Sequence, residues 1–258
     1  MIKPMNKSAS RALDILAMLA KENRPLMLKE IGAALELPKS STFEIVYTML
    51  ARGFLEQDEN KKFSLGLKTF EIGSAYLKGV DVVQAAIPYL EALAKLVNET
   101  VFLAVNKDSR IVYLYKAIGS SNIVHTCDLG SHNSMHCTGL GKALLAGYSD
   151  ERVRKIAEDQ TLTRLAQRTL TSLDDLFEEL SKTRERGYAV DDRENRDDSF
   201  CVAAPLFSTH KEPIAAISVA TFFFKIDERY YDLLSREVPK TAMEISRKMG
   251  FTNKRFYE

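Results

Sequence analysis

The stretch from Leu28 to Glu56 constrains this chain most, because two short helical patterns flank a proline and then lead into a strand. Apolar residues at Leu28, Ile31 and Leu35 recur at the spacing of one helix face, which predicts a short first helix. Pro38 cannot continue a helix interior, and it biases the residue before it away from helical backbone angles. The first helix must therefore end in a tight turn before Pro38.

A second helix is expected to begin in the hydroxyl-rich run after this turn, because Ser and Thr side chains can accept backbone N–H bonds at a helix start. Gly53 suits the C-terminal end of that helix. The turn-prone residues 58–61 separate two strand-like runs, which predicts a hairpin and completes the pattern of a winged helix-turn-helix. The expected core side of the second helix consists of Phe43, Val46, Tyr47 and Leu50, with Ile45 and Met49 at its edge.

Any small helical domain also contains a helix, a turn and a helix, so this pattern alone leaves a simpler alternative open. An amphipathic run from Ser8 to Leu19 weakens that alternative, because it supplies a third helix for a compact core. A module of this kind places its second turn-flanking helix in the major groove of DNA. The residues expected to contact DNA are Lys39, Ser40, Ser41, Thr42, Thr48 and Arg52 around that helix, and Lys61 and Lys62 in the wing.

The charge balance argues against a bulk polycation. The 258 residues have a net charge of +1, and residues 1–65 hold 10 Lys and Arg against 8 Asp and Glu. That is a weak electrostatic footprint for nucleic-acid binding. Any DNA contacts must therefore come from local placement of basic and hydroxyl side chains beside phosphates.

The cysteine content and the lengths of the apolar runs indicate the cellular compartment. Three cysteines without a secretory leader indicate a reducing environment and no disulfide framework. No run of about 18 apolar residues is present, so no transmembrane helix is expected. We therefore expect a cytoplasmic protein that does not enter a membrane.

The remainder of the chain predicts a connecting helix followed by an α+β domain with helices flanking an antiparallel sheet. The apolar residues of the connector could pack in the core of one domain or form a seam between two copies. We favour the seam, because a connector has no core of its own. The expected domains are residues 1–66, 67–81 and 82–258. The expected strands of the last domain are residues 101–105, 111–115, 123–125, 188–190, 201–207 and 214–221.

Three motifs in this order resemble the IclR family of bacterial transcription regulators over nearly the whole chain. They are the N-terminal segment SASRALDILAMLAKENRPLMLKEIGAALELPKSSTFEIVYTMLARGFLEQDENKKFSLG, the run MHCTGLGKALLA at 135–146, and the pair RERGYAVDD at 184–192 and CVAAPLF at 201–207. The resemblance implies a winged helix-turn-helix domain, a linker helix and a C-terminal effector-binding domain related to GAF-type sensor folds. It also implies a regulator with no enzymatic activity and no cofactor.

The same resemblance implies an effector pocket in the C-terminal domain. The residues that it places there are Gly139, Leu140, Asp191, Cys201, Ser218 and Ala220. Many relatives have a second serine where Ala220 stands, so one hydroxyl is missing here. Arg193 and Arg196 add positive charge near the pocket, where they either bind an acidic effector or lie on a solvated loop, and we favour the solvated loop.

Two further departures from the family pattern concern single positions. Asp198 stands where the second motif often has a glycine. Many relatives have arginine where this chain has Glu44, and a glutamate repels phosphate but can accept a hydrogen bond from cytosine N4. An operator sequence cannot therefore be inherited from relatives.

The run HCTGLGKALLA invites comparison with a phosphate-binding loop, but it fails that test. The nucleotide motif would need glycine at His136 and Ser or Thr at Ala143. What remains is a helix start with small residues around it, which favours a small anion such as a carboxylate.

A competing interpretation comes from a cluster of histidines and cysteines between 125 and 137. Imidazole and thiolate are preferred zinc ligands, so a metal-binding sensor or enzyme is the alternative function. The spacing matches no zinc finger or ribbon, and a nucleophilic role for Cys137 or Cys201 conflicts with the usual inertness of buried cysteines. The cluster consists of His125, Cys127, His132, His136 and Cys137.

The sequence thus predicts a transcription regulator whose binding to double-stranded operator DNA responds to a small organic effector, with a carboxylic acid favoured. A homodimer or a dimer of dimers is expected. A protein-binding adaptor is disfavoured, because the second helix opens with polar and basic residues rather than the apolar anchors of a protein interface.

Overall fold

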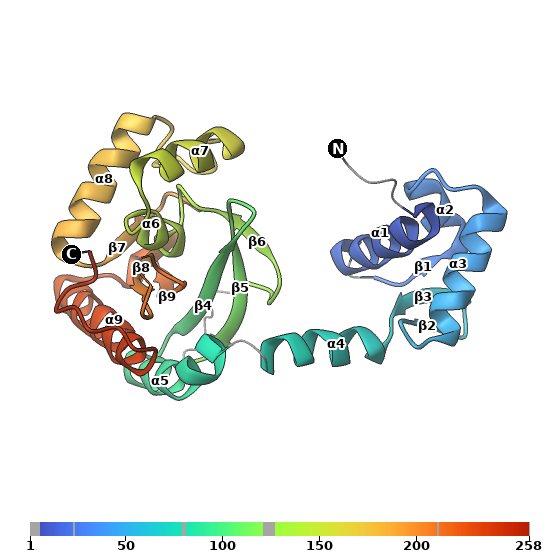
Figure 1. Ribbon diagram of the computed structural model, residues 1–258, viewed down its shortest axis with the longest axis horizontal. Coiled ribbons are helices and arrows are strands. Elements are labelled where there is room, and N and C mark those ends of the chain that lie inside the picture. The colour runs from blue at the N-terminus through green and yellow to red at the C-terminus, as the bar shows by residue number, and fades with distance from the viewer. Residues whose placement is uncertain (1–5, 23, 79–80, 121–126, 211, 258) are drawn as a thin grey trace. The chain divides into compact units, whose positions relative to one another are not determined.

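The computed structural model of the chain describes residues 6–22, 24–78, 81–120, 127–210 and 212–257 (Figure 1). The chain divides into two compact units, Met1–Gly79 and Val80–Glu258. None of the described helices is long and apolar enough to cross a lipid bilayer.

The first unit is a winged helix-turn-helix, which confirms the predicted fold. It contains α1 (Lys7–Glu22), β1 (Leu26–Met27), α2 (Leu28–Ala34), α3 (Lys39–Ala51), β2 (Leu55–Gln57), β3 (Lys62–Leu65) and α4 (Leu67–Lys78). The three strands form one antiparallel sheet in the order β1-β3-β2. Its core is a single cluster made by Ile15, Leu19, Leu26, Ile31, Val46, Met49, Leu55 and Phe63.

The inward side of α3 differs from the one expected. The buried residues of this helix are Thr42, Val46 and Met49, so the prediction was right for Val46 and wrong for Phe43 and Tyr47. The helix turns its threonine inward because α2 and α3 pack closely there. A side chain at Gly32 would approach the Thr42 hydroxyl oxygen to 3.2 Å.

Helix α4 exposes apolar side chains along much of its length. Leu67 is 64% exposed, Phe70 is 70% exposed and Ile72 is 52% exposed. The predicted linker helix over 67–81 thus corresponds to a helix that ends at Lys78 among the described residues. These three side chains do not belong to the core cluster of the first unit.

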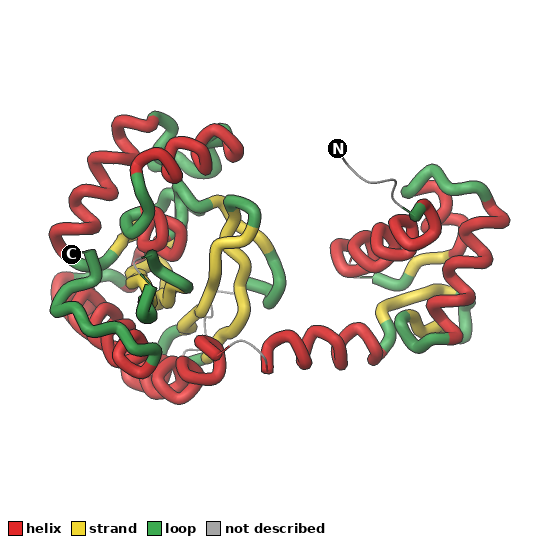
Figure 2. Tube along the Cα trace, viewed as in Figure 1, coloured by secondary structure: helices red, strands yellow, loops and turns green. Residues whose placement is uncertain are grey.

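The second unit is a six-stranded antiparallel sheet with helices on both faces, as Figure 2 shows. Its elements are α5 (Asp81–Val97), β4 (Thr100–Lys107), β5 (Arg110–Ala117), β6 (His132–Ser134), α6 (Gly139–Leu145), α7 (Asp150–Gln160), α8 (Leu173–Arg186), β7 (Ala189–Asp192), β8 (Ser199–Leu206), β9 (Ala215–Phe222), the short 3-10 helix η1 (Phe223–Lys225) and α9 (Glu228–Lys248). The sheet order is β6-β5-β4-β9-β8-β7. Helices α5 and α9 pack on one face, whereas α6 packs against β7, β8 and β9 on the other, next to α8.

The predicted α+β class is confirmed, with differences at single elements. Strand β6 was not expected, and the strand expected at 123–125 lies outside the described residues. Asp108 and Ser109 both have positive φ, of 50° and 63°, and they close the tight hairpin between β4 and β5.

Candidate functional site

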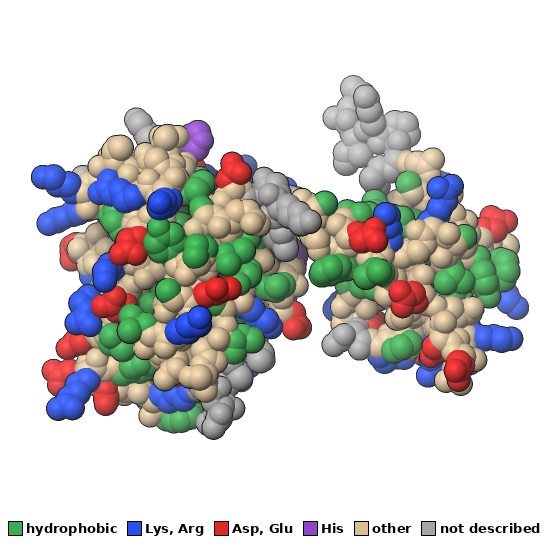
Figure 3. All heavy atoms as spheres, turned by 90° about the horizontal axis from the view of Figure 1, so that it is seen from below, with side chains coloured by type: hydrophobic (Ala, Val, Ile, Leu, Met, Phe, Trp, Pro, Cys, Tyr) green, Lys and Arg blue, Asp and Glu red, His purple; other side chains and the backbone are tan. Residues whose placement is uncertain are grey.

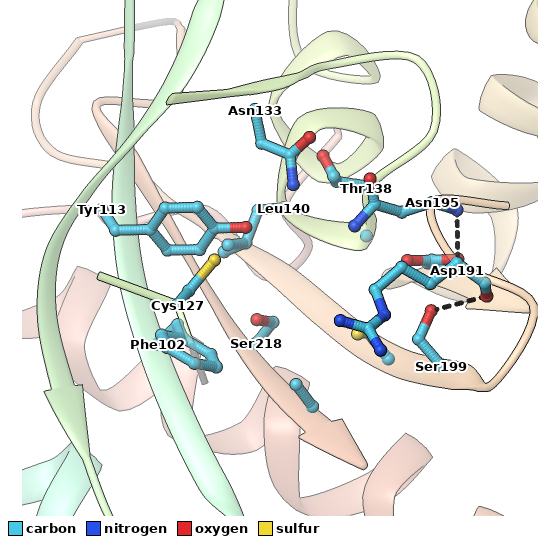
Figure 4. Close-up of a pocket in the computed structure, with 14 residues that line it drawn as sticks. Phe102, Tyr113, Cys127, Asn133, Thr138, Leu140, Asp191, Asn195, Ser199 and Ser218 are labelled. Atoms are coloured by element: carbon cyan, nitrogen blue, oxygen red, sulfur yellow. Dashed lines mark hydrogen bonds between the residues drawn. The ribbon is translucent and has the colours of Figure 1, made fainter. Parts of the chain in front are cut away.

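A cavity of about 280 Å³ lies in the second unit, between the start of α6, the strands β4, β5, β8 and β9, and the loop from β7 to β8. All six residues expected in an effector pocket line this one cavity (Figure 4). They are Gly139 and Leu140 from α6, Asp191 from β7, Cys201 from β8, and Ser218 and Ala220 from β9. The structure therefore brings them together, although their sequence positions span about 80 residues.

The opposite wall of the cavity was not predicted from the sequence. Figure 4 shows Phe102, Tyr113 and Cys127 across the cavity from Asp191, Asn195 and Ser199. The Phe102 and Tyr113 rings meet edge to face, with centroids 5.4 Å apart. Residues 100–104 of β4 are all buried, so the sequence has no polar alternation that could tell the cavity face from the helix-covered face.

Asp191 is the most unusual group in the cavity lining. It is 2% exposed, and its Oδ1 accepts hydrogen bonds from the backbone N–H groups of Glu194 at 2.8 Å and Asn195 at 3.4 Å. Burial raises the pKa of the Asp191 carboxyl to about 7; the charge of Glu194 adds to the rise and that of Lys142 opposes it. The cavity therefore holds a carboxyl group that can donate or accept near neutral pH.

A buried ion-pair network behind the cavity holds its loop in place. The side chain of Lys142 in α6 is fully buried, pairs with Glu194 in the β7–β8 loop and lies 3.6 Å from a Glu179 carboxylate oxygen in α8. Glu179 in turn accepts from Arg186 at 2.6 Å. Burial raises the pKa of Glu194, and Lys142 opposes that rise. These charges tie α6, α8 and the loop into one assembly.

The two arginines of the loop separate in the structure. Arg196 lines the cavity, and its Nε and Nη2 each lie 3.1 Å from a carboxylate oxygen of Asp198. Arg193 instead stacks over the Phe223 ring, 3.5 Å from its centroid, and pairs with Asp192 at 2.8 Å. Arg196 is exposed, as expected for a residue of a solvated loop, but it also lines the cavity. Arg193 does not line the cavity.

The start of α6 shows why small residues occupy the cavity wall. The hydroxyl of Thr138 accepts from the backbone N–H of Gly141 at 3.1 Å and so caps the helix. A side chain at Gly139 would approach the Ala203 Cβ to 3.2 Å. Glycine therefore allows α6 to lie close to β8, beside the cavity.

The described part of the histidine and cysteine cluster does not converge. His136 is buried with its Nε2 3.1 Å from the Thr163 carbonyl oxygen, and burial lowers its pKa. Burial raises the pKa of the Cys137 thiol to about 12 and that of Cys201 well above its usual range. No three His, Cys, Asp or Glu side chains among the described residues are grouped to hold a metal ion, and His125 lies outside the described residues.

The candidate DNA surface is the outward side of α3 together with the wing. Thr42 is a correction to the predicted contacts, because its side chain is 1% exposed and its hydroxyl donates to the Pro38 carbonyl at 3.0 Å. Of the other predicted residues, Ser41 and Lys62 are half-buried, and the rest are exposed: Lys39, Ser40, Thr48, Arg52 and Lys61. Figure 3 shows basic and acidic side chains interspersed over the drawn face of each unit, which agrees with the weak overall charge.

Comparison with protein families identifies both parts of the chain. A family model described as the IclR helix-turn-helix domain matches residues 8–59. A second, described as the bacterial transcriptional regulator IclR C-terminal domain, matches residues 74–247. The HTH-type transcriptional regulator KdgR of Escherichia coli (strain K12) is 30% identical over 247 residues, covering 95% of this chain and 94% of KdgR. The transcriptional repressor IclR of the same strain is 31% identical over 247 residues, covering 95% of this chain and 90% of IclR.

Solved structures show the same fold. The crystal structure of the Thermotoga maritima IclR superposes with a TM-score of 0.82 at 28% identity, covering 95% of this chain and 99% of that one. An IclR homolog from Microbacterium hydrocarbonoxydans, solved in complex with 4-hydroxybenzoate, gives a TM-score of 0.81 at 22% identity, covering 94% and 100%.

Proposed function

The chain belongs to the IclR family of DNA-binding transcription regulators, and we propose that a small organic acid held in its C-terminal cavity changes its affinity for operator DNA. The observation that carries this proposal is the convergence of a buried carboxyl, an arginine, hydroxyl groups and aromatic rings on one cavity. A ligand that binds one conformation of the protein more tightly than another shifts the balance between them.

In the proposed complex, α3 lies in the major groove and the wing lies over the adjacent backbone. Ser40, Ser41 and Thr48 supply hydroxyl groups along α3, and Lys39 and Arg52 flank its two ends. Lys61 lies in the wing turn with a φ of 58° and an exposed side chain. Such cations neutralise phosphates and release counterions, which provides the sequence-independent part of the affinity.

We further propose that two copies of the chain share one operator. The exposed apolar residues of α4, Leu67, Phe70 and Ile72, would be covered by a second copy, because an exposed apolar face of this kind marks a contact surface. Two copies related by a twofold axis read two half-sites, so the operator would be roughly palindromic.

The salt dependence of DNA binding tests the wing contact and the copy number together. Each phosphate contact contributes a slope of about 0.9 to the decline of log affinity with log salt concentration. We expect Lys61→Ala to reduce this slope by about 1.8 if two copies each lose one contact, and by about 0.9 if one copy binds. Gel-shift titration with genomic fragments, including the chain's own promoter, at several salt concentrations measures the slope.

The matched control for this experiment is Lys155→Ala, which removes an exposed lysine of the C-terminal unit. Its slope should equal that of the wild type. An unchanged slope for Lys61→Ala would remove the wing contact from the proposal, and affinity that does not depend on salt at all would contradict DNA binding by this surface.

The cavity favours a small acid with a polar or aromatic body. Its volume of about 280 Å³ lies just below the range of about 300–1,000 Å³ that is typical of ligand sites, which favours a small ligand. Arg196 offers a charge-assisted contact for a carboxylate, Ser218 offers a hydroxyl, and the rings of Phe102 and Tyr113 offer an apolar wall. The homolog solved with 4-hydroxybenzoate makes this acid a reasonable first probe.

We expect Arg196→Gln to weaken binding of the acid by about tenfold. A hydrogen bond to a charged group contributes roughly 1.5–3 kcal/mol, and the contribution of Arg196 should fall at the lower end of this range because its side chain is exposed. Arg193→Gln is the matched control, since it removes the same charge from the same loop without touching the cavity. Thermal-shift titrations with small carboxylic, aromatic and sugar acids, starting from 4-hydroxybenzoate and its neutral amide, report the affinity through ligand stabilisation.

The bound acid should also change the fraction of shifted operator DNA, and it should do so less effectively for Arg196→Gln. Equal stabilisation of the wild type by the acid and by its amide would contradict the role of Arg196. An equal loss of affinity for the acid in Arg196→Gln and Arg193→Gln would contradict it as well. Binding of the acid without any effect on DNA affinity would contradict the proposed regulation.

A further inference from the structure

Two aromatic side chains project from the outward side of α3. Phe43 is 50% exposed and Tyr47 is 37% exposed, one helical turn apart. Their ring centroids lie 4.3 Å apart with a 33° angle between the planes. The Tyr47 ring also meets the buried ring of Phe63 edge to face at 5.8 Å, so a residue of the core and of the wing sheet fixes the position of the pair.

The other exposed side chains on this part of α3 define what it can recognise. Beyond Lys39, which begins the helix, the exposed residues of α3 are Ser40, Phe43, Glu44, Tyr47, Thr48 and Ala51. None of these six is Arg, Lys, Asn or Gln, the side chains that make bidentate contacts with guanine or adenine in the major groove. The Glu44 carboxylate only accepts hydrogen bonds when ionised, so it can pair with the amino groups of cytosine or adenine but not with the acceptors of guanine.

We propose that Phe43 and Tyr47 form an aromatic wall that packs against the C5-methyl groups of thymines in each operator half-site. The thymine methyl is the one apolar group that the bases present in the major groove. This inference rests on the proposed placement of α3 in that groove, and it adds the base that this side of the helix reads. It also accounts for the solvent exposure of two adjacent aromatic rings, because an exposed apolar patch marks a contact surface.

The test begins with the wild-type chain and an operator fragment defined by footprinting. Each thymine of a half-site is replaced by deoxyuridine, which removes the C5-methyl and leaves the base-pairing hydrogen bonds unchanged. We expect a loss of about fourfold in affinity for each thymine that the wall contacts, the amount that burial of one methylene-sized group supplies. Thymines outside the half-sites serve as the internal control.

Variants then assign the effect to the rings. Phe43→Ala should weaken binding to the thymine operator and bring the ratio of thymine to deoxyuridine affinities close to one. Tyr47→Phe keeps the ring and removes the hydroxyl, so it should retain the ratio. Leu13→Ala, which removes an exposed apolar side chain from α1 of the same unit, should also leave the ratio unchanged.

The outcomes separate this inference from the proposed function. Equal affinity of the wild type for thymine and deoxyuridine operators overturns the aromatic wall while leaving operator binding intact, and this measurement needs no variant to fold. A ratio that survives in Phe43→Ala overturns the assignment of the wall to Phe43. Failure of the wild type to bind any genomic fragment would remove the DNA-reading role of α3 itself.

Discussion

Replacing Lys142 by methionine is expected to destabilise the C-terminal unit by about 3–5 kcal/mol at neutral pH, the usual effect of removing one partner of a buried ion pair. Methionine fills a similar volume, so the loss would come from charge rather than from a cavity. Without the ammonium group, Glu194 keeps a carboxylate in a buried site, where its Oε2 has no partner among the described residues. Glu179 and Asp191 would lose the same compensating charge. Urea denaturation followed by circular dichroism measures the change in the free energy of unfolding.

Two variants make this result specific. Lys182→Met removes an exposed lysine that pairs with Glu178 in α8, and we expect it to leave the free energy of unfolding nearly unchanged, because solvent screens such surface pairs. Combining Lys142→Met with Glu194→Gln should recover a large part of the loss, because the uncompensated carboxylate is then neutral. If the single variant were as mild as Lys182→Met, the network could not be what holds the loop.

Asp191→Asn should stabilise the protein, and the gain should grow with pH. The pKa of this carboxyl rises from an ordinary value of 3.8 to about 7 in the folded chain. The protonated Asp191 contributes its full stability below pH 3.8. This contribution is lost as the pH rises through 7, because the unfolded chain releases the proton at a lower pH than the folded chain. Asparagine removes that loss and can still accept from the N–H of Glu194.

The size of the effect follows from the shift. Each pKa unit corresponds to about 1.4 kcal/mol, so the gain in stability at pH 8 has an upper bound of about 4 kcal/mol. The pKa of Asp191 also depends on the charges of Glu194 and Lys142, so the measured gain includes their interactions with this carboxyl. Unfolding free energies of both proteins from pH 4 to pH 8 measure it. Asp192→Asn is the control, since it removes a neighbouring half-buried carboxylate that pairs with Arg168 and Arg193, and we expect it to lose stability rather than gain it. A constant difference between the Asp191 variant and the wild type across this range would contradict the expected titration.

The sequence predicted the elements of the N-terminal unit well because their signals are local. Pro38 ends the turn, Gly53 with a φ of 75° ends α3, and the residues before Lys62 form the wing turn. The inward side of α3 was predicted wrongly, because patterning assigns large aromatic residues to the core. Here a small threonine fits against Gly32, and the aromatic residues remain on the surface.

The cavity was predicted only as far as the family resemblance reached. Lys142 looks like a solvent-facing lysine in the sequence, and its partner Glu194 lies 52 residues further along the chain. No local pattern connects two such positions. The loop arginines show the same limit, because Arg193 has a φ of 60° and turns to Phe223 while Arg196 borders the cavity.

The close fit between Thr42 and Gly32 has a consequence for how such regulators diversify. The inner seam of the two helices fixes their relative placement, whereas the rings of Phe43 and Tyr47 contribute little to that seam. With the proposed aromatic wall, substitution of Phe43, the more exposed ring, would therefore alter which promoters are recognised at small cost in folding, whereas Tyr47 also packs on the core ring of Phe63. A duplicated gene with this architecture could acquire a new set of targets in a few mutational steps while its folded scaffold stayed the same.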